Sequence, residues 1–439
     1  METVTVVGAG FAGCEAAWRL ANMGIGVRLC EMKPHKYTPA HSYQGFAELV
    51  CSNSLKAKRA ASAAGMLKEE MRRLGSLTMQ CADEAEVGAG GALAVDRKQF
   101  SDLVTAKIKA CPQIEIVNGE VTKIPKGKVV IATGPLTSDK LSQSIRELVG
   151  EEYLYFHDAA APIVTAESID FNKAFFASRY GRGDADYINC PMEKDEYLRF
   201  YNELIEAETA PLHAFDKQPD GFSVYEGCMP IEVLAKRGED TMRYGPLKPV
   251  GITHPVTNKR YYAVVQLRAE NRDKDMYNIV GFQTNLKFGE QKRAFSLIPG
   301  LENAEFVRYG VMHRNTFVNS PKLLDVNLAL RKNKNVYFAG QITGVEGYIE
   351  SAASGIAAGI NMAQTVSGRE SVTLPETTML GSLCRYVSDE SVENFQPMGS
   401  NMGILPPLDE KIKNKKPRYE RLAERGLNDL SDMIRQLDI

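Results

Sequence analysis

The chain opens with a short apolar segment that runs directly into a glycine-rich turn, V-T-V-V-G-A-G-F-A-G over residues 4–13. In this pattern Gly8 permits a tight turn, Gly10 lets a pyrophosphate approach the backbone, and Gly13 lets the next helix pack closely on the strand. A second apolar segment ends at Glu31, whose carboxylate suits the hydroxyls of an adenosine ribose. The pattern therefore predicts a dinucleotide site at a helix N-terminus. The residues expected to hold the dinucleotide here are Gly8, Ala9, Gly10, Phe11, Ala12, Gly13 and Glu31.

Length and composition restrict the class of protein. A chain of 439 residues exceeds what one hydrophobic core supports, so two domains are expected. With 44% hydrophobic and 25% charged residues it resembles an ordinary globular protein. No apolar run approaches the roughly 20 residues of a membrane span, and no signal peptide is recognised. We therefore expect a cytoplasmic protein with no membrane contact, whose cysteines stay reduced.

The 8 cysteines form neither a C-x-x-C pair nor a Cys/His cluster with metal-ligand spacing. This pattern argues against a metal site and against a disulfide reductase with a redox cysteine pair. The net charge of −2 gives no support for nucleic-acid binding from bulk charge. A nucleic-acid partner would have to be recognised by a local basic patch.

Two later segments of the chain are predicted to add strands to the same dinucleotide-binding sheet. A buried strand over residues 128–135 ends in A-T-G, with Gly134, and another over residues 335–340 ends at Gly340. A helix of small residues follows, with its N-terminus near Gly347. Nucleotide-facing segments this far apart favour FAD, which extends across such a domain, over NAD.

The region between these segments is richer in tyrosine and alternates strand-like stretches with polar turns. We therefore predict an α/β fold, a Rossmann-like FAD-binding domain with a doubly wound parallel sheet and an inserted α+β domain. The FAD-binding domain comprises residues 1–148 and 322–439, and the inserted domain residues 149–321. Periodicity predicts helices over Gly65–Leu74 and from Asp96, and strands over Ile114–Val117, Val121–Ile124, Tyr261–Leu267 and Tyr277–Phe282, the last two as neighbours.

Longer motifs carry a specific resemblance. They are F-A-E-L-V-C-S-N-S-L-K (46–56), G-G-A-L-A-V-D-R (90–97), A-T-G-P-L-T-S (132–138), V-Y-E-G-C-M-P-I-E (224–232), R-Y-G-V-M-H-R-N-T (308–316) and A-G-Q-I-T-G-V-E-G-Y-I-E-S-A (339–352). The chain resembles the bacterial folate- and FAD-dependent tRNA (uracil-5-)-methyltransferases from its first residues to about Pro407. It is also similar to the larger flavoproteins that modify the tRNA wobble uridine.

The resemblance implies C5 methylation of the T-loop uridine of tRNA, position 54. The carbon comes from 5,10-methylenetetrahydrofolate, and NADPH or NADH supplies reducing equivalents through FAD. Two alternatives stay open, namely the same chemistry on ribosomal RNA and a flavin-binding RNA assembly factor without turnover. The paired motif cysteines argue against the second and against a small-molecule flavin oxidoreductase.

The chemistry identifies candidate catalytic residues. C5 of uracil becomes nucleophilic when a thiolate adds to C6, so the site requires a reactive cysteine near a flavin. Cys51 and Cys228 lie in the family motifs, and we favour Cys228 as the nucleophile with Cys51 assisting. The resemblance places Tyr348 beside the flavin ring. Arg97 is expected either to reach the cofactor phosphates or to form a salt bridge.

The other cysteines are expected to be buried hydrophobes, namely Cys14, Cys30, Cys81 and Cys111, whereas Cys190 is undecided. Two basic stretches are candidates for tRNA contact. The first contains Arg237, Arg243, Lys248, Lys259, Arg260, Arg268 and Arg272, and an equally good interpretation of it is a solvated charged face. The second, Lys411–Arg418 with Arg421 and Arg425, is denser and therefore the stronger candidate.

Overall fold

The computed structural model describes residues 2–150, 154–181, 184–210, 229–392 and 395–437. Its first sheet has six strands in the order β16-β17-β7-β1-β2-β6. All neighbours in it are parallel except the edge pair β16 and β17. The strands are β1 (Thr3–Val7), β2 (Gly26–Glu31), β6 (Ile114–Asn118), β7 (Val129–Ile131), β16 (Ala329–Leu330) and β17 (Asn333–Phe338). The predicted α/β fold with a parallel sheet is confirmed.

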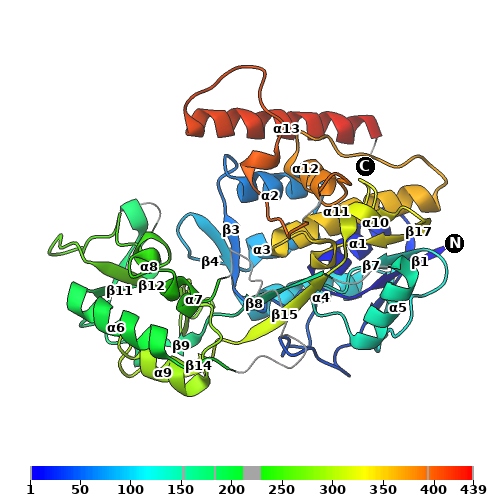
Figure 1. Ribbon diagram of the computed structural model, residues 1–439. Coiled ribbons are helices and arrows are strands. Elements are labelled where there is room, and N and C mark those ends of the chain that lie inside the picture. The colour runs from blue at the N-terminus through cyan, green and yellow to red at the C-terminus, as the bar shows by residue number, and fades with distance from the viewer. Residues whose placement is uncertain (1, 151–153, 182–183, 211–228, 393–394, 438–439) are drawn as a thin grey trace.

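Helices cover both faces of this sheet because successive side chains of a strand point to opposite faces. Val130 and Tyr337 pack in the core formed with α1 (Phe11–Asn22) and α11 (Tyr348–Val366). Val129 and Ile131 pack in a separate core with α5 (Asp139–Val149). The two layers are visible in Figure 1, at the end of the molecule that carries both termini.

Close packing of α1 on α11 depends on small residues. A Cβ added at Gly355 would lie 2.2 Å from the Ala12 carbonyl oxygen, and one at Gly359 would lie 3.1 Å from that of Ala16. The small residues of the helix predicted after Gly340 thus contact the helix that follows the glycine turn. This contact fixes the N-terminus of α11 beside that turn.

The second large sheet is antiparallel, with the order β10-β11-β12-β13-β9-β14. Its strands are β9 (Ile163–Thr165), β10 (Phe175–Ala177), β11 (Tyr187–Met192), β12 (Ala263–Ala269), β13 (Met276–Ile279) and β14 (Phe306–Arg308). The helices of this region are α6 (Lys194–Glu206), α7 (Ile231–Lys236), α8 (Thr241–Tyr244) and α9 (Phe288–Phe295). The sheet lies within the proposed inserted domain, and the predicted pairing of its two central segments is confirmed as β12 and β13.

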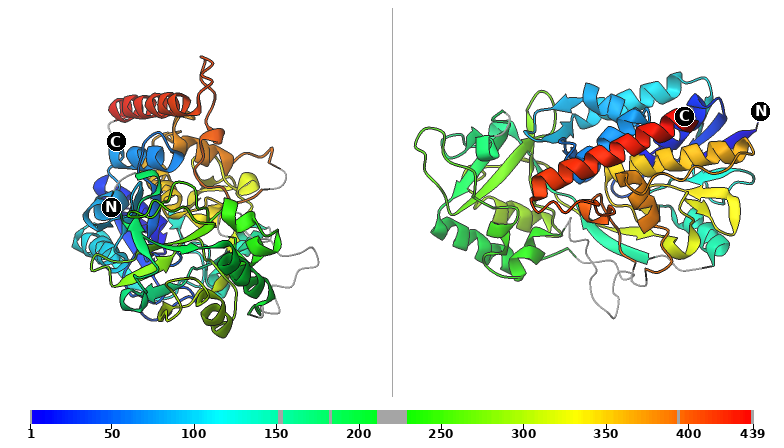
Figure 2. Two further views of the ribbon diagram at one scale, coloured as in Figure 1. Left: turned by 90° about the vertical axis from the view of Figure 1, so that its left-hand side faces the viewer. Right: turned by 90° about the horizontal axis from the view of Figure 1, so that it is seen from above.

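Smaller elements connect and cover the two sheets. A two-stranded ribbon of β8 (Leu154–Ala159) and β15 (Met312–Phe317) carries the chain between them. A three-stranded sheet contains β3 (Ser54–Ala57), β4 (Glu86–Val87) and β5 (Ala92–Val95). The remaining helices are α2 (Ala63–Arg73), α3 (Leu77–Glu84), α4 (Arg97–Ala110), α10 (Ser320–Leu323), α12 (Met379–Tyr386) and α13 (Lys415–Leu437). Figure 2 shows α13 lying along the outside of the molecule, across α2 and α12.

The prediction of a strand at Val121–Ile124 is wrong, because these residues lie in irregular structure. Val121 and Ile124 pack against the core that includes α5. The Ile124 amide donates to the Ser144 hydroxyl of that helix at 3.2 Å. Contact with a helix therefore satisfies the apolar side chains that the pattern assigned to a strand.

Candidate active site

A cavity of about 420 Å³ runs along the carboxyl ends of the parallel strands and reaches the loop that contains Cys51. Such a position is where open α/β sheets bind nucleotides. Its lining includes residues of four separated segments, namely Gly8–Ala12, Glu31–Lys33, Ala132–Ser138 and Gly347–Ile349, together with Gly340. We call it the dinucleotide cavity.

The glycines of the first turn have the distinct environments that their spacing predicts. Gly8 has a φ of +99°, which other residues rarely adopt, and a Cβ at Gly13 would lie 1.8 Å from the Gly8 carbonyl oxygen. At Gly10 an added Cβ would meet no protein atom within 4 Å, and this residue lines the cavity. Gly134, Gly340 and Gly347, from later segments, line the same cavity at φ values of +66°, +85° and +123°.

The Glu31 carboxylate closes one end of the turn. It accepts hydrogen bonds from the Ala9 amide at 2.8 Å and from the Lys33 amide at 3.0 Å. Both bonds hold the carboxylate at the edge of the cavity, which it lines. Its negative charge there fits a ribose, whose hydroxyls donate hydrogen bonds.

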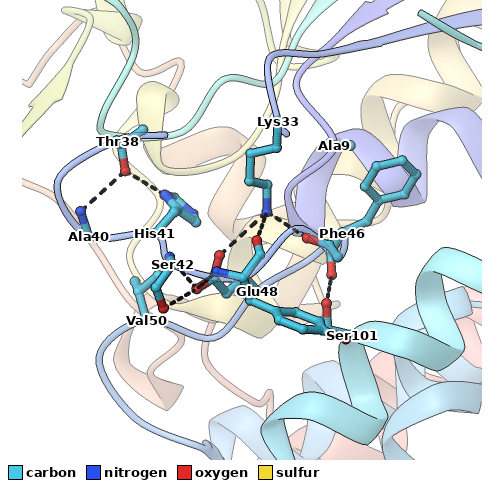
Figure 3. A network of polar contacts seen from close by, with 12 residues as sticks. Ala9, Lys33, Thr38, Ala40, His41, Ser42, Phe46, Glu48, Val50 and Ser101 are labelled. Atoms are coloured by element: carbon cyan, nitrogen blue, oxygen red, sulfur yellow. Dashed lines mark hydrogen bonds and ion pairs between the residues drawn. The ribbon is translucent and has the colours of Figure 1, made fainter. Parts of the chain in front are cut away.

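The loop after β2 is fixed by a buried lysine (Figure 3). Lys33 donates to the Tyr43 carbonyl oxygen at 3.1 Å and lies 3.5 Å from a carboxylate oxygen of Glu48. The other oxygen of Glu48 accepts from the Ser42 amide at 2.9 Å. In the same loop the Thr38 hydroxyl and the His41 ring are 2.6 Å apart. The network fixes the backbone that leads to Cys51.

Cys51 and Tyr348 meet although 297 residues separate them in the sequence. The Tyr348 hydroxyl accepts hydrogen bonds from the backbone amides of Val50 and Cys51, both at 2.8 Å. Its oxygen also lies 3.0 Å from the Cys51 sulfur. Because both lone pairs of the hydroxyl already accept, its own hydrogen is the one available to the sulfur. The Tyr348 ring stacks on Phe11, with centroids 4.9 Å apart.

Burial raises the pKa of Tyr348 well above its ordinary value, and the neighbouring Cys51 raises it further. Tyr348 therefore stays protonated near neutral pH. A neutral phenol beside the sulfur is a hydrogen-bond donor, which favours the thiolate form of the cysteine.

A buried carboxylate lies in the first turn of α11. Glu350 accepts from Lys56 at 2.6 Å and from the Ser400 hydroxyl at 2.6 Å. Burial favours its neutral form, but Lys56 and Ser400 outweigh burial and lower the pKa of Glu350. The ion pair ties the cavity-lining Lys56 to the N-terminus of α11. Lys56 was expected from the sequence as a cation near Cys51, whereas Glu350 was not singled out, although it lies in a quoted motif.

Arg97 lies outside the lining of the dinucleotide cavity. Its guanidinium pairs with Glu270 of the inserted region and donates to the Leu49 carbonyl oxygen at 2.6 Å. This geometry corresponds to the salt bridge, the second of its two expected roles. The side chain thereby connects the Cys51 loop to the antiparallel sheet.

Arg308 is a second guanidinium near the cysteine that sequence reasoning did not identify. Its Nε and one terminal nitrogen are buried without a hydrogen-bond partner among the described residues. Burial and repulsion from Arg97 lower the pKa of Arg308. It interacts electrostatically with Cys51 and Tyr348, so it adds positive charge to their surroundings. Arg308 could have been identified from the sequence only by its place in the motif R-Y-G-V-M-H-R-N-T.

Cys228 lies outside the described residues, so its position relative to Cys51 stays a prediction. Cys14, Cys30 and Cys81 are buried, as expected, whereas Cys111 is partly exposed. Burial raises the pKa of the Cys81 thiol to about 12. Cys190, which was undecided, is fully buried, and burial raises its pKa strongly, so it is a core residue.

The basic stretches differ in their surroundings. In the first, Arg268 is buried and bonded to Asn53, and Arg272 donates to the Glu84 carbonyl oxygen. In the second, the five cations of residues 411–418 are exposed. Arg421 pairs with Glu410 and Glu424, and Arg425 donates to backbone carbonyl oxygens of residues 406 and 407.

The described part of the chain lacks two kinds of feature. None of the helices in that part of the chain is long and apolar enough to cross a membrane. Nor does that part contain a cluster of three or more His, Cys, Asp or Glu side chains suited to a metal ion.

Comparison with known proteins gives a consistent result. Residues 3–370 match the family described as Glucose inhibited division protein A. A relative from Acetivibrio thermocellus, named methylenetetrahydrofolate--tRNA-(uracil-5-)-methyltransferase TrmFO, is 59% identical over 99% of both chains. A relative of the same name from Bacillus subtilis is 55% identical, also over 99% of both.

Among solved structures, GidA from Aquifex aeolicus aligns with a TM-score of 0.70 at 18% identity, over 99% of this chain and 76% of that one. This likeness shows a shared fold. Together with the full-length identity to the named relatives, it confirms the family resemblance found in the sequence. The chain belongs to the TrmFO family of tRNA (uracil-5-)-methyltransferases, within the broader GidA family.

Proposed function

We propose that this protein transfers a one-carbon unit from 5,10-methylenetetrahydrofolate to C5 of a uridine in tRNA, with FAD as cofactor and NADPH or NADH as reductant. The observation that carries the proposal is the 59% identity, over nearly the whole length, to a relative named for this activity. The uridine we propose is that of the T loop, position 54. The cytoplasm, where tRNA is modified, is the proposed location.

The residues of the dinucleotide cavity fit FAD. Gly10 leaves room for a pyrophosphate at the N-terminus of α1, and Glu31 offers a carboxylate for the ribose. We propose that the backbone turns at Gly8–Ala12, Gly134, Gly340 and Gly347 hold the remainder. When bound, FAD supplies the reducing equivalents that complete the methyl group.

The uracil ring is activated by sulfur chemistry. A thiolate that adds to C6 forms a C–S bond and moves an electron pair toward O4 and C5, so that C5 attacks the electrophilic methylene. Loss of the C5 proton then lets the C–S bond break and returns the electron pair to sulfur. Replacement of the methylene's remaining C–N bond by hydride would complete the methyl group, with the electron pair of that bond staying on the carrier nitrogen. We favour Cys228 as the sulfur that adds and Cys51 as the group that takes the C5 proton.

The surroundings of Cys51 support this second role. The Tyr348 hydroxyl lies 3.0 Å from its sulfur and has a hydrogen to donate. Arg97 and Arg308 add positive charge nearby. Hydrogen-bond donors and cations both favour a thiolate, the form that accepts a proton.

The test is incubation with unmodified tRNA, labelled methylenetetrahydrofolate and NADPH, with and without S-adenosylmethionine. Label should enter the T-loop uridine in both reactions. Label in ribosomal RNA alone would assign the chemistry to a different acceptor, and transfer that requires S-adenosylmethionine would contradict the folate mechanism.

A further inference from the structure

A second cavity, of about 360 Å³, meets the dinucleotide cavity at Cys51, Ser52 and Gln283, which line both. Its other walls come from the inserted region. They are Ala161, Met229, Leu234, Pro246, Arg268, Asn278, Val280 and Gly281. A volume of this size is typical of a small-ligand site.

The polar wall of this cavity is a cross-strand pair. Arg268 on β12 and Asn278 on β13 are register partners, so their side chains emerge on the same face of the sheet. Arg268 is held in place by bonds to Asn53 at 2.9 Å and to the Ser52 hydroxyl at 2.8 Å. This arrangement joins the sheet to the residue that follows Cys51.

Asn278 has an unused hydrogen-bond donor. The residue is only 3% exposed, and its amide nitrogen has no hydrogen-bond partner among the described residues. Buried amide donors in folded proteins are almost always paired, because leaving one unpaired is unfavourable. A buried, unpaired donor that lines a cavity therefore points to a ligand with an acceptor atom.

We propose that this second cavity receives the target uracil and that Asn278 recognises the carbonyl edge of the base. The inference rests on the proposed function. In this arrangement the Asn278 amide donates to O4 of the base, and Arg268 adds positive charge on the same side. Neither residue was predicted from the sequence to be catalytic.

Two observations favour a pyrimidine as the occupant. The base must reach a thiol at C5 and C6, and Cys51 forms part of this cavity, while Met229 follows Cys228 in the sequence. The lining also includes the apolar side chains of Met229, Leu234 and Pro246. Enzymes that act on an extruded base read its edge with hydrogen bonds and enclose its faces with apolar side chains.

The anchoring of α7 shapes this wall. The Ile231 amide donates to the Gln283 carbonyl oxygen at 2.7 Å. The Glu232 carboxylate accepts from the Thr284 hydroxyl and the Asn285 amide, both at 2.8 Å. Met229 is thereby held against the turn that follows β13.

The chemistry of the amide predicts discrimination between bases. Uracil presents an acceptor at O4, whereas cytosine presents an amino donor at the same place. Asn278→Asp replaces the donor by an acceptor, so it should weaken the uridine reaction and favour cytidine. Asn278→Ala removes the contact without reversing it.

The experiment uses full-length holoenzyme and tRNA transcripts with uridine or cytidine at the accepted position. We expect Asn278→Ala to lower kcat/KM on the uridine transcript by about 10- to 100-fold. Asn278→Asp should lower it further and raise the cytidine-to-uridine ratio by about tenfold or more. Asn202→Asp, an exposed site on α6, makes the same charge change outside the cavity and should match wild type.

Further measurements separate the possible failures. Oxidation of NADPH by the bound flavin without tRNA should be unchanged in the Asn278 variants. Wild-type kcat/KM in both folded variants would overturn this inference alone, whereas absence of transfer by the wild-type protein would overturn the proposed function. If the Asn278 variants unfold, Leu234→Trp provides a second test, because it adds bulk to the cavity from α7. It should block methyl transfer to tRNA and leave reduction of the flavin by NADPH intact. Methyl transfer at the wild-type rate would overturn the inference.

Discussion

The two cavities that meet at Cys51 are built from different kinds of structure. The dinucleotide cavity is formed largely by backbone turns at the ends of parallel strands, and two of its glycines, Gly8 and Gly10, belong to one short motif. The second cavity is lined by side chains from an antiparallel sheet, from α7 and from the Cys51 loop. A cofactor held by backbone leaves a local sequence pattern. A base read by side chains is recognised by residues that only tertiary packing brings together.

The largest effect is expected at the glycine turn, where a substitution tests whether the backbone turn itself is needed for folding and for flavin binding. Gly13→Ala would force a Cβ within 1.8 Å of the Gly8 carbonyl oxygen, so the strand and α1 must separate. We expect loss of the cooperative unfolding transition and of bound flavin. Both are measured by thermal unfolding and by flavin absorbance per chain.

Gly10→Ala provides the contrast, because its Cβ meets no protein atom within 4 Å. This variant should fold normally and lose only flavin affinity. Gly289→Ala, an exposed helical site in α9, should bind flavin as wild type does. Full flavin content in Gly10→Ala would mean that the ligand does not approach this turn.

The next effect is expected at the junction of the cavities. Cys51→Ala should lower methyl transfer by about 1,000-fold or more, as loss of an essential catalytic group does. Flavin content should stay unchanged, because the backbone turns proposed to hold the cofactor, at Gly8–Ala12, Gly134, Gly340 and Gly347, are intact in this variant. Cys111→Ala, a partly exposed cysteine in another part of the domain, is the matched control. Transfer by Cys51→Ala at the wild-type rate would remove Cys51 from the mechanism.

Tyr348→Phe tests whether the Tyr348 hydroxyl stabilises the thiolate of Cys51. It removes the donor beside the Cys51 sulfur and the acceptor of two backbone amides. Since the raised pKa of Tyr348 keeps it protonated, the donor is present throughout the neutral range. Its loss disfavours the thiolate, so the rising limb of the pH–rate profile should move to higher pH and the rate near neutrality should fall about 10- to 100-fold.

Tyr337→Phe is the control for this variant. Its hydroxyl bonds to the Thr365 hydroxyl at 3.0 Å within the core, and Tyr337 does not line the cavity. It should change stability but not the pH profile. An unshifted profile in Tyr348→Phe would show that the hydroxyl has no influence on the ionisation of Cys51.

The same contrast explains what the sequence could predict. The parallel sheet, the glycine turn and Glu31 follow from local periodicity and spacing, and the structure places all of them around one cavity. The family resemblance placed Tyr348 beside the flavin ring, but its contact with Cys51 was not predicted, since 297 residues separate the two. Nothing local indicates that Asn278 lies opposite Arg268, or that Arg308 lies near Cys51, because strand register and domain contact decide both.

The role of Arg97 could not be predicted from its motif alone. Its motif and its position at the start of α4 were compatible with a phosphate ligand or a salt bridge. The choice depended on Glu270, which is 173 residues away. The prediction of a strand over Val121–Ile124 was wrong for a related reason. These residues contact α5 instead of pairing with a neighbouring strand.

The ion pair of Arg97 with Glu270, which connects the Cys51 loop to the antiparallel sheet, should show a moderate effect. Glu270→Gln would leave the Arg97 guanidinium without its buried counter-charge and close to Arg308. We expect the free energy of unfolding to fall by about 3 kcal/mol, measured by chemical denaturation. Glu115→Gln, which breaks an exposed pair with Arg28, should cost less than about 1 kcal/mol. Equal effects would mean that the Arg97–Glu270 pair is solvated.

The smallest effect is expected at the exposed cations before and at the start of α13, far from both cavity linings in sequence. Replacing Lys411, Lys413 and Lys415 by Ala should weaken tRNA binding by several-fold to about tenfold at low salt. The slope of log affinity against log salt should fall by about 2, since each phosphate contact on a single strand contributes about 0.7.

A triple variant of Lys109, Lys123 and Lys126 removes the same charge from exposed sites elsewhere on the domain. It should leave both affinity and slope nearly unchanged. Should the two triple variants lose affinity equally, the effect would be one of net charge. If neither changes the salt dependence, tRNA contacts another face, and the cations of residues 411–418 are a solvated surface. A specific loss would instead separate the two parts of recognition, with phosphates bound by these exposed cations and the base read in the second cavity.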